Sequence, residues 1–364
     1  MSALPTRLQH LADSLQELEL DAMLVTDEIN VRYLSGFTGD SSSLVVTSAE
    51  TTILSDGRYS AQIAQQCNGI ATRIRNSRQV SRDLIGEVVR ECGAKRVGVE
   101  ADHMTLAEFR FLDGGCEEIE LVATGGVVEK LRMIKDEAEI TATRTAVEIA
   151  QRVFQELVPT FTSEHTEIEV AHEMEHRLRG LGAEGCSFPP IVAAGPGGAL
   201  PHYQPKNVPF ANHKSLLIDW GAKFEGYASD LTRTLHQHDV GDKFKRAYEG
   251  VLEAQLAAIE LIKPGMPVRE IDAAARAALQ RHGILEAFSH GLGHGTGLQI
   301  HEMPRMSPIS DEILASGMII TVEPGVYYDG DFGIRIEDDV LVTDSGHEVL
   351  SSLPKGLDDC RFIL

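Results

Sequence analysis

The sequence predicts two globular domains in series, an α/β domain followed by an α+β domain. The first observation is length, because 364 residues are enough for two domains that each bury a core. The second is the order of the patterns: short β-branched runs alternate with helical stretches early in the chain and give way to hairpin-like runs later. The third is a composition of 43% hydrophobic and 24% charged residues, which is typical of globular proteins.

The first domain is predicted from strands and helices that alternate along the chain. An amphipathic helix over Leu8 to Leu20 leads into the strand-like runs DAMLVT, SSLVVTS and TTILSD. The helical stretch SRDLIGEVVREC then precedes the strand RVGVE. This region ends near TGGVVEKLRMIKDEAE, so we place the boundary at residues 125–132 and the two domains at residues 1–128 and 129–364.

A long helix is expected near the start of the second domain, over Asp136 to Leu157. The DEAE run that opens it puts acidic side chains at the positive N-terminal end of the helix dipole. Further helical segments follow, together with two hairpin-like runs rich in β-branched residues, and this mixture predicts the α+β class.

Charge and cysteine usage restrict the partners and the compartment. A formal net charge of −22 repels phosphate backbones and anionic membranes, so we expect neither nucleic acid nor a membrane as a partner. No apolar run approaches the roughly 18 residues of a membrane span, and we expect no signal peptide. We interpret the scattered cysteines, which form no CxxC pair, as reduced and mostly buried thiols of a cytoplasmic protein: Cys67, Cys92, Cys116, Cys186 and Cys360.

The stretch HEMEH, from His172 to His176, matches the His-Glu-x-x-His signature of zinc peptidases. The surrounding helix argues against that function, because its apolar stripe is formed by Val170, Met174 and Leu178. Both histidines lie about 200° around the helix from that stripe, at 3.6 residues per turn. A zinc site of this type needs both histidines to face a cleft that excludes water. We therefore interpret HEMEH as part of a solvated helix face.

Acidic residues at the ends of apolar strands form a stronger pattern. In SLLIDWGAKFEGYASDLTRTL, one apolar strand ends at Asp219 and the returning strand carries Asp230. In GMIITVEPGVYYDGDFGIRIEDDVLVT the same plan recurs, with Glu323 after the first strand and Glu337 on the returning one. Between the two hairpins, SHGLGHGTGLQIHEMP places His294 in a glycine-rich run.

Four buried carboxylates that converge would repel each other and would be desolvated at a large cost. Two divalent ions would balance the four negative charges. Ligation by carboxylates with one imidazole suits Mn²⁺, Co²⁺ or Zn²⁺ better than it suits a cysteine-bound structural zinc.

The runs DWGAKFEGYASDLTRT, HGLGHGTGLQIHE, TVEPGVY and RIED resemble the pita-bread metallopeptidases, in the branch of the Xaa-Pro peptidases. The resemblance covers the second domain, which is expected to be a pita-bread catalytic domain. The runs VTDEINVRYLSGFTGDSSSLVVT and LSDGRYS resemble the creatinase/prolidase N-terminal domain. This small first domain distinguishes the chain from the one-domain methionine aminopeptidases.

The resemblance implies a set of five ligands for two metal ions, with Mn²⁺ as the expected metal and Co²⁺ or Zn²⁺ as alternatives. Asp230 and Glu337 are implied to bridge the ions, and Asp219 to complete the first. His294 and Glu323 are implied to complete the second. Such a pair of ions can polarise a peptide carbonyl and activate water.

The same resemblance suggests which residues surround the metals. Glu323 is expected to accept the proton of the attacking water, and His290 and His301 to contact the scissile carbonyl or the proline ring. The expected substrate-binding residues are His202, Arg305, Tyr327 and Arg335. Period-2 alternation puts Arg335 and Glu337 on the same face of a strand, so Arg335 is expected beside the metals.

The resulting hypothesis is a hydrolase that cleaves the Xaa-Pro bond at the N-terminus of short proline-containing peptides. We favour an Xaa-Pro dipeptidase, because Arg305 matches an arginine that holds the carboxylate of a dipeptide in some prolidases. The alternative is an Xaa-Pro aminopeptidase that acts on longer peptides. A metal-free creatinase-like enzyme and a non-catalytic binding module are more remote alternatives, which the intact ligand set disfavours. A homodimer is expected from the two-domain relatives.

We predict that His172→Ala and His176→Ala each leave turnover within a few-fold of the parent protein, because both side chains lie on a polar helix face. Steady-state kinetics of the purified variants would measure this. A loss above about a thousandfold, the scale of losing a catalytic group, would instead support the zinc-peptidase interpretation.

Overall fold

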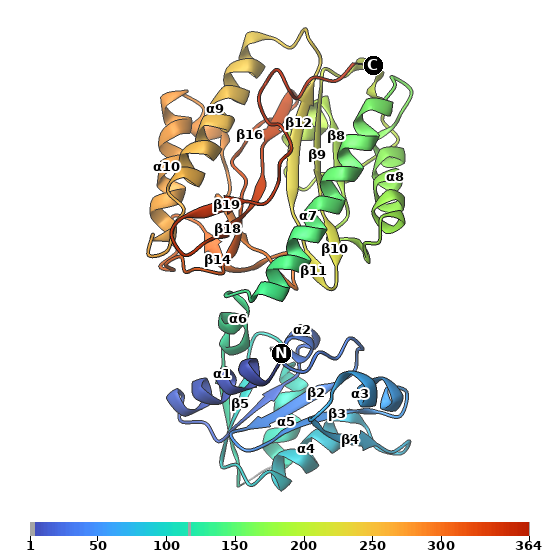
Figure 1. Cartoon of the computed structure of the whole chain (residues 1–364), viewed down its shortest axis with the longest axis vertical. Coiled ribbons are helices and arrows are strands. Elements are labelled where there is room, and N and C mark those ends of the chain that lie inside the picture. The colour runs from blue at the N-terminus through green and yellow to red at the C-terminus, as the bar shows by residue number, and fades with distance from the viewer. Residues whose placement is uncertain (1–3, 116–117, 364) are drawn as a thin grey trace. The chain divides into compact units, whose positions relative to one another are not determined.

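The computed structural model describes residues 4–115 and 118–363. The chain divides into two compact units, of which the first ends at Arg132 and the second begins at Met133 (Figure 1). Each unit has its own buried apolar core. Within the described ranges, no helix is both long and apolar enough to cross a membrane.

The first unit is built on one six-stranded sheet with the order β4-β3-β2-β1-β5-β6. Strand β1 pairs in parallel with β5 and antiparallel with β2, and β3 and β4 are also parallel. The strands are β1 (Ala22–Val25), β2 (Ser43–Thr47), β3 (Thr51–Asp56), β4 (Ala71–Arg75), β5 (Arg96–Glu100) and β6 (Glu120–Thr124). The four strand-like runs predicted from the sequence correspond to β1, β2, β3 and β5.

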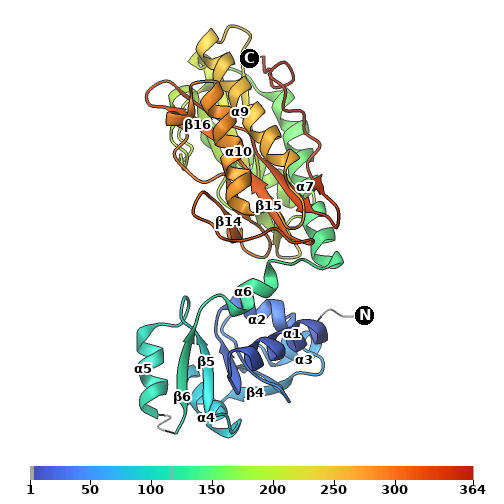
Figure 2. The same cartoon turned by 90° about the vertical axis from the view of Figure 1, so that its left-hand side faces the viewer.

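Helices lie on both faces of this sheet (Figure 2). On one face, Leu84 and Val88 of α4 and Leu112 of α5 are buried against Leu24 and Val97 of the sheet. The helices are α1 (Leu4–Glu17), α2 (Glu28–Ser35), α3 (Ser60–Gln66), α4 (Ser81–Glu91), α5 (Leu106–Gly115) and α6 (Val127–Arg132).

The first helix differs from its predicted range of Leu8 to Leu20. It begins at Leu4 and ends at Glu17, and Glu19 has a φ of 55°, in the left-handed region where a helix cannot continue. Leu20 is nevertheless buried, although it lies beyond the helix. The spacing of apolar residues therefore continues past the last helical residue, and the predicted helix end was placed too late in the sequence. Of the five cysteines, the four that the structure describes are free thiols, and Cys67 and Cys360 are buried. Cys116 lies outside the described residues.

The long helix of the second unit, α7 (Glu137–Leu157), begins as predicted. The Asp136 side chain accepts hydrogen bonds from the backbone of Ala138 and Glu139, and Glu139 reaches back to the Asp136 N–H. This capping box satisfies N–H groups that have no partner inside the helix. The other long helices are α8 (Glu167–Gly180), α9 (Asp242–Glu260) and α10 (Val268–Arg281).

Antiparallel strands fill the space between the helix pairs α7/α8 and α9/α10 (Figure 1). One sheet has the order β12-β9-β8 and another β11-β10-β7; a third runs β14-β13-β15-β18-β19, and β16 and β17 form a hairpin. The first two sheets contain β7 (Gly185–Cys186), β8 (Ile191–Ala194), β9 (Ser215–Trp220), β10 (Ala222–Phe224), β11 (Tyr227–Ala228) and β12 (Leu231–His236). The rest are β13 (Gly293–Gly295), β14 (Glu302–Met306), β15 (Ile319–Val322), β16 (Gly325–Tyr328), β17 (Phe332–Arg335), β18 (Asp338–Val342) and β19 (His347–Val349).

Trp220 and Thr232 help to connect these sheets to the helices and to each other. Trp220 is fully buried at the end of β9, where its ring stacks on Phe154 of α7 at a centroid distance of 4.5 Å. Its indole N–H donates to the carbonyl of Ala150. Thr232 of β12 forms an isolated antiparallel bridge with Glu337, just before β18. Because of that bridge, the β9/β12 and β15/β18 pairs meet where the sequence placed its acidic residues.

Candidate metal centre

The structure brings the five predicted ligands to one cavity of about 660 Å³ in the second unit. Asp219 lies in β9, directly opposite Thr232 of β12, and Asp230 lies just before β12. The other three come from the third sheet and its connections: His294 from β13, Glu323 from the residue after β15, and Glu337 from the residue before β18. Antiparallel pairing therefore gathers residues that are more than a hundred positions apart in the sequence.

The imidazole of His294 is held in one orientation and one tautomer. Its Nδ1 lies 3.0 Å from the carbonyl oxygen of Gly295, which can only accept a hydrogen bond, so Nδ1 carries the proton. The unprotonated Nε2 then faces Glu323 Oε1 at 3.5 Å and Asp230 Oδ2 at 3.6 Å. Ligand atoms of Asp230, His294 and Glu337 all lie within 4.8 Å of one another. Three lone-pair donors thus converge on a space that suits a cation.

Burial and mutual repulsion raise the pKa values of the acids around this space. The pKa values of Asp230 and Glu337 are raised well above their ordinary values, first by burial and then by neighbouring carboxylates. Burial also raises the pKa of Glu323 to about 8, although Arg335 opposes the shift. The pKa of His294 is lowered by burial to about 4, so the imidazole stays neutral.

One guanidinium partly compensates the acids. Arg335 is 3% exposed; its Nη2 pairs with Asp219 Oδ2, and its Nε donates to the Thr232 hydroxyl. That hydroxyl in turn donates to Glu337 Oε2 at 2.6 Å. Asp219 Oδ1 is buried and has no hydrogen-bond partner among the described residues. One guanidinium cannot balance four carboxylates. The unpaired oxygen of Asp219 and the free Nε2 of His294, which lies near Asp230 and Glu323, are lone-pair donors of the kind that a divalent ion requires.

Arg335 also begins a directed chain of hydrogen bonds. Its Nη1 donates to the Tyr327 hydroxyl at 2.9 Å, and that hydroxyl lies 2.9 Å from His290 Nε2. His290 Nδ1 lies 2.7 Å from the carbonyl of Gly291, so Nδ1 carries the proton and Nε2 accepts from Tyr327. Arg335 thus contacts both Asp219 and Tyr327, and Tyr327 connects it to His290. It ends β17 and Glu337 precedes β18, so the two residues do not share one regular strand as the period-2 argument assumed.

The remaining predicted residues lie around the cavity at different distances from the acids. His202 and His301 both line it and are both exposed, and the ring of His301 lies 4.4 Å from that of His294. Arg305 is exposed, and it is not among the described residues that line this cavity. It is the Cα partner of His294 across β13 and β14, so both side chains leave the same face of the ladder.

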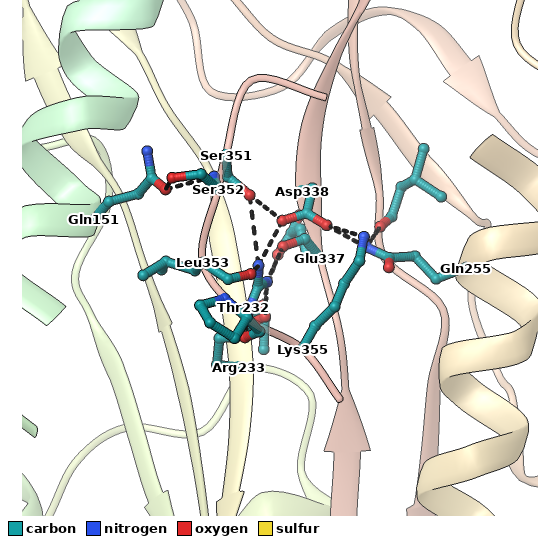
Figure 3. Close-up of polar contacts among 12 residues, drawn as sticks. Gln151, Thr232, Arg233, Gln255, Glu337, Asp338, Ser351, Ser352, Leu353 and Lys355 are labelled. Atoms are coloured by element: carbon teal, nitrogen blue, oxygen red, sulfur yellow. Dashed lines mark hydrogen bonds and ion pairs between the residues drawn. The ribbon is translucent and has the colours of Figure 1, made fainter. Parts of the chain in front are cut away.

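A second charged cluster lies behind Glu337 (Figure 3). Arg233 is fully buried and donates to the carbonyl of Glu337 at 2.6 Å and to Asp338 Oδ1 at 2.7 Å. Asp338 also accepts from Lys355 and from Gln255. Burial acts to raise the pKa of Asp338, but Arg233 and Lys355 outweigh it and hold that pKa below its ordinary value. The cluster fixes the backbone on which Glu337 sits.

Sequence reasoning did not identify Thr232, Arg233 or Asp338. All three lie in the quoted runs DLTRT and RIEDD, and β12 is buried at every position, on both faces. The available signal was this burial, because a strand with no solvent face can carry an arginine only if that arginine is paired.

Helix α8 confirms that HEMEH does not face a cleft. His172 and His176 are both exposed, and Val170, Met174 and Leu178 on the other side are buried. The carboxylate between the two histidines, Glu173, pairs with Arg177 at 2.7 Å. The helix face that carries the motif therefore contributes nothing to the cavity.

Two family models match the chain. The model of metallopeptidase family M24 matches residues 141–344, more than half of the chain, and the model of the creatinase/prolidase N-terminal domain matches residues 7–134. The chain is a member of metallopeptidase family M24. It is therefore a metallopeptidase of the pita-bread fold with a creatinase-like first domain, as the sequence predicted. M24 peptidases use divalent metal ions, and the convergent donors described above are a possible site for them.

Similar proteins of known name support the same family. An uncharacterized peptidase of Bacillus subtilis, YqhT, is 35% identical over 351 residues, which cover 96% of this chain and 99% of the relative. Among solved structures, an Xaa-Pro dipeptidase from Bacillus anthracis is 36% identical with a TM-score of 0.93, covering 97% of this chain and 99% of that one. An X-Pro aminopeptidase from Thermotoga maritima is 33% identical with a TM-score of 0.87, covering 97% and 100%.

We predict that this M24 peptidase, freed of metal by a chelator, loses thermal stability as the pH rises. The pKa of Glu323 rises from 4.5 to about 8 on folding, and those of Asp219, Asp230 and Glu337 also rise. Groups with raised pKa values contribute stability that is complete below the unfolded pKa and is lost as the pH passes the folded pKa. The melting temperature should therefore fall between pH 4.5 and about pH 8.

Differential scanning calorimetry at several pH values would measure this dependence. Added Mn²⁺ should flatten it, because a bound cation replaces the protons, and Glu323→Gln should flatten it in the metal-free protein. A metal-free protein whose stability is constant or rises over this range would contradict the electrostatic account.

Proposed function

We propose that this M24 metallopeptidase cleaves the Xaa-Pro bond of short peptides, with Xaa-Pro dipeptides as its preferred substrates. The observation that carries the proposal is the cavity itself, in which the acid cluster adjoins apolar and imidazole groups. Its apolar lining includes Phe188, Pro189, Pro190, Ile191 and Ile300. A volume of about 660 Å³ suits a small peptide. A proline ring has no N–H to donate and offers apolar surface, which this lining can cover.

The five convergent residues are proposed to hold two divalent ions. Asp230 and Glu337 would be shared, Asp219 would complete the first ion, and His294 with Glu323 would complete the second. Mn²⁺ is the proposed metal, with Co²⁺ or Zn²⁺ as alternatives, because the set is rich in carboxylate oxygen and contains one imidazole. When bound, such ions polarise the peptide carbonyl, activate water and orient the amino terminus.

Glu323 is the proposed acceptor of the proton from water. Its backbone is fixed by a hydrogen bond from its N–H to the carbonyl of Leu292 at 2.8 Å, and the Thr321 hydroxyl lies 3.4 Å from Oε1. With a cation bound beside it, Glu323 would be ionised, so its carboxylate could accept the proton of water and pass it to the leaving amine.

The histidines are proposed to bind the substrate. His301 and His202 are exposed at the cavity and can approach the scissile carbonyl or the proline ring. His290 has both ring nitrogens engaged, so a bond from His290 to a substrate carbonyl would replace its bond to Tyr327. Tyr327 and Arg335 therefore set the orientation of His290 as well as lining the cavity.

The choice between dipeptides and longer peptides depends on Arg305. A positive charge on the same ladder face as His294 could pair with the carboxylate of a bound dipeptide, a charge that longer peptides lack at this position. An Xaa-Pro aminopeptidase is the second candidate, because Arg305 does not line the cavity and one similar structure is named an X-Pro aminopeptidase. We further propose a homodimer located in the cytoplasm, which light scattering and fractionation would test.

We predict that the bridging residues control both metal ions. Asp230→Ala or Glu337→Ala should remove both ions, because each would share its two carboxylate oxygens between them, whereas Asp219→Ala should mainly affect one. Elemental analysis after dialysis against Mn²⁺ would measure the stoichiometry, with Glu169→Gln on the exposed part of α8 as the control. Two ions and full activity in Asp230→Ala would refute the assignment. A parent protein that binds no stoichiometric ion would instead favour a creatinase-like enzyme or a binding module.

We predict that Arg305→Ala selectively impairs the cleavage of dipeptides. Losing a charge-assisted hydrogen bond costs about 1.5–3 kcal/mol, or roughly ten- to a hundredfold in kcat/KM. Xaa-Pro-Yaa tripeptides should be affected much less, because an amide replaces the charge. Comparing kcat/KM for matched Xaa-Pro and Xaa-Pro-Yaa substrates would measure the effect. Equal losses of kcat/KM on both substrates would refute the role of Arg305 in holding the dipeptide carboxylate. A parent protein that prefers tripeptides would favour the assignment as an Xaa-Pro aminopeptidase.

A further inference from the structure

A carboxylate outside the acid cluster holds the cavity segment that carries His202. Glu167, the first residue of α8, is fully buried. Its Oε1 accepts the N–H of Ala194 at 2.8 Å. Its Oε2 accepts the Tyr203 hydroxyl at 2.9 Å and the N–H of Lys206 at 3.0 Å. A single side chain therefore ties together two points of the backbone that lie on either side of His202.

The backbone of the helix end completes this attachment. The N–H of Glu167 donates to the carbonyl of Val208, and the N–H of Ile168 donates to the carbonyl of Lys206, both at 3.1 Å. These are first-turn N–H groups, which have no acceptor inside their own helix. The helix terminus thus donates to the same segment from which its first side chain accepts.

The segment between these attachments forms one wall of the cavity. Pro201, His202, Tyr203, Gln204 and Pro205 all line it. The preceding turn, Gly195–Ala199, packs closely on β17, because a Cβ at Gly333 would lie 1.7 Å from the carbonyl oxygen of Gly198. The segment is therefore held on one side by α8 and on the other by the strand that carries Arg335.

We propose that Glu167 is a positioning residue that sets His202 for substrate binding. The proposal rests on the proposed function, in which His202 contacts the peptide. A carboxylate is needed at this position, because its two oxygens accept two different backbone N–H groups. A glutamine has only one oxygen, so its amide NH₂ would face one of those N–H groups and leave it unpaired in a buried place.

Glu169 provides a matched control on the same helix. It is also a glutamate in the first turn, and it accepts the N–H and hydroxyl of Thr166, but it is exposed and makes none of the hydrogen bonds by which Glu167 holds the 194–208 segment. Glu169→Gln tests the general effect of removing a charge from the N-terminus of α8, without releasing the wall of the cavity.

Steady-state kinetics on an Xaa-Pro dipeptide, in the metal-loaded full-length protein, would test the proposal. Glu167→Gln should raise KM about tenfold or more, change kcat by less than about threefold, and leave the metal content unchanged. Glu169→Gln should leave all three near the parent values. A loss of bound metal, or a fall in kcat at constant KM, would show that Glu167 supports the fold or the metal centre and would overturn the proposal.

A double-mutant cycle with His202→Ala separates positioning from general stability. If Glu167 acts through His202, Glu167→Gln should change KM by less than about twofold once His202 is absent. An equal effect in both backgrounds would refute the role of His202. If Glu167→Gln yields too little folded protein, Tyr203→Phe can replace it, because it removes only one of the three groups that donate to Glu167. Tyr203→Phe should likewise raise KM in the parent protein but not in the His202→Ala background.

Limited proteolysis keeps the attachment testable without any substrate. Lys206 is exposed, so trypsin should cut the chain after it faster in Glu167→Gln than in the parent protein or in Glu169→Gln. A parent protein that cleaves no Xaa-Pro peptide would refute the proposed function, while faster cutting after Lys206 would still support the attachment. Equal cutting rates in all three proteins would refute the attachment itself.

Discussion

The repulsion among three buried carboxylates and the partly buried carboxylate of Glu323 is the constraint around which the second unit is organised. Asp219, Asp230 and Glu337 are 8%, 5% and 2% exposed, so water cannot screen their charges. A fold that gathered these groups without compensation would be strongly disfavoured. Arg335 pairs with Asp219, and the lone pair of His294 points toward Asp230 and Glu323. The negative charge that Arg335 does not neutralise favours the binding of divalent metal ions. The same carboxylates that oppose folding therefore create a site for cations.

Holding the acids together against this repulsion requires a rigid backbone. The residues that fix this backbone, which we call the charged frame, are Thr232, Arg233, Glu337 and Asp338. Thr232 and Glu337 are joined both through the backbone and through their side chains, and Arg233 donates to the carbonyls of both residues. Removing one member of a buried ion pair such as Arg233 with Asp338 costs about 3–5 kcal/mol, because the other charge is left unpaired. A distortion that separated these partners would leave a buried charge unpaired, so the frame fixes the backbone from which the acids project.

Much of this arrangement could be predicted from the sequence, for physical reasons that differ between residues. The acids were identifiable because a charged residue at the end of an apolar strand is unusual, and HEMEH could be dismissed because helical periodicity decides which face is buried. Glu167 and Arg233 could not be identified in the same way, since their partners lie far along the chain and depend on how sheets and loops meet. Local pattern also misplaced the end of α1, where Leu20 extended the apolar period past a residue in the left-handed conformation.

The acid cluster and the cavity wall around His202 are held by separate sets of contacts, and under the proposed function that separation bears on how the peptide is selected. The acids lie in or next to strands whose pairing is fixed by the charged frame, so a change there disturbs the acid cluster and the fold together. The wall around His202 is a segment without regular strands, attached through Glu167 and the close contact of Gly198 with Gly333. Loops attached to a rigid scaffold can vary with little effect on the core. Under the proposed function, substitutions in this wall would alter which peptide is accepted while the acid cluster is kept.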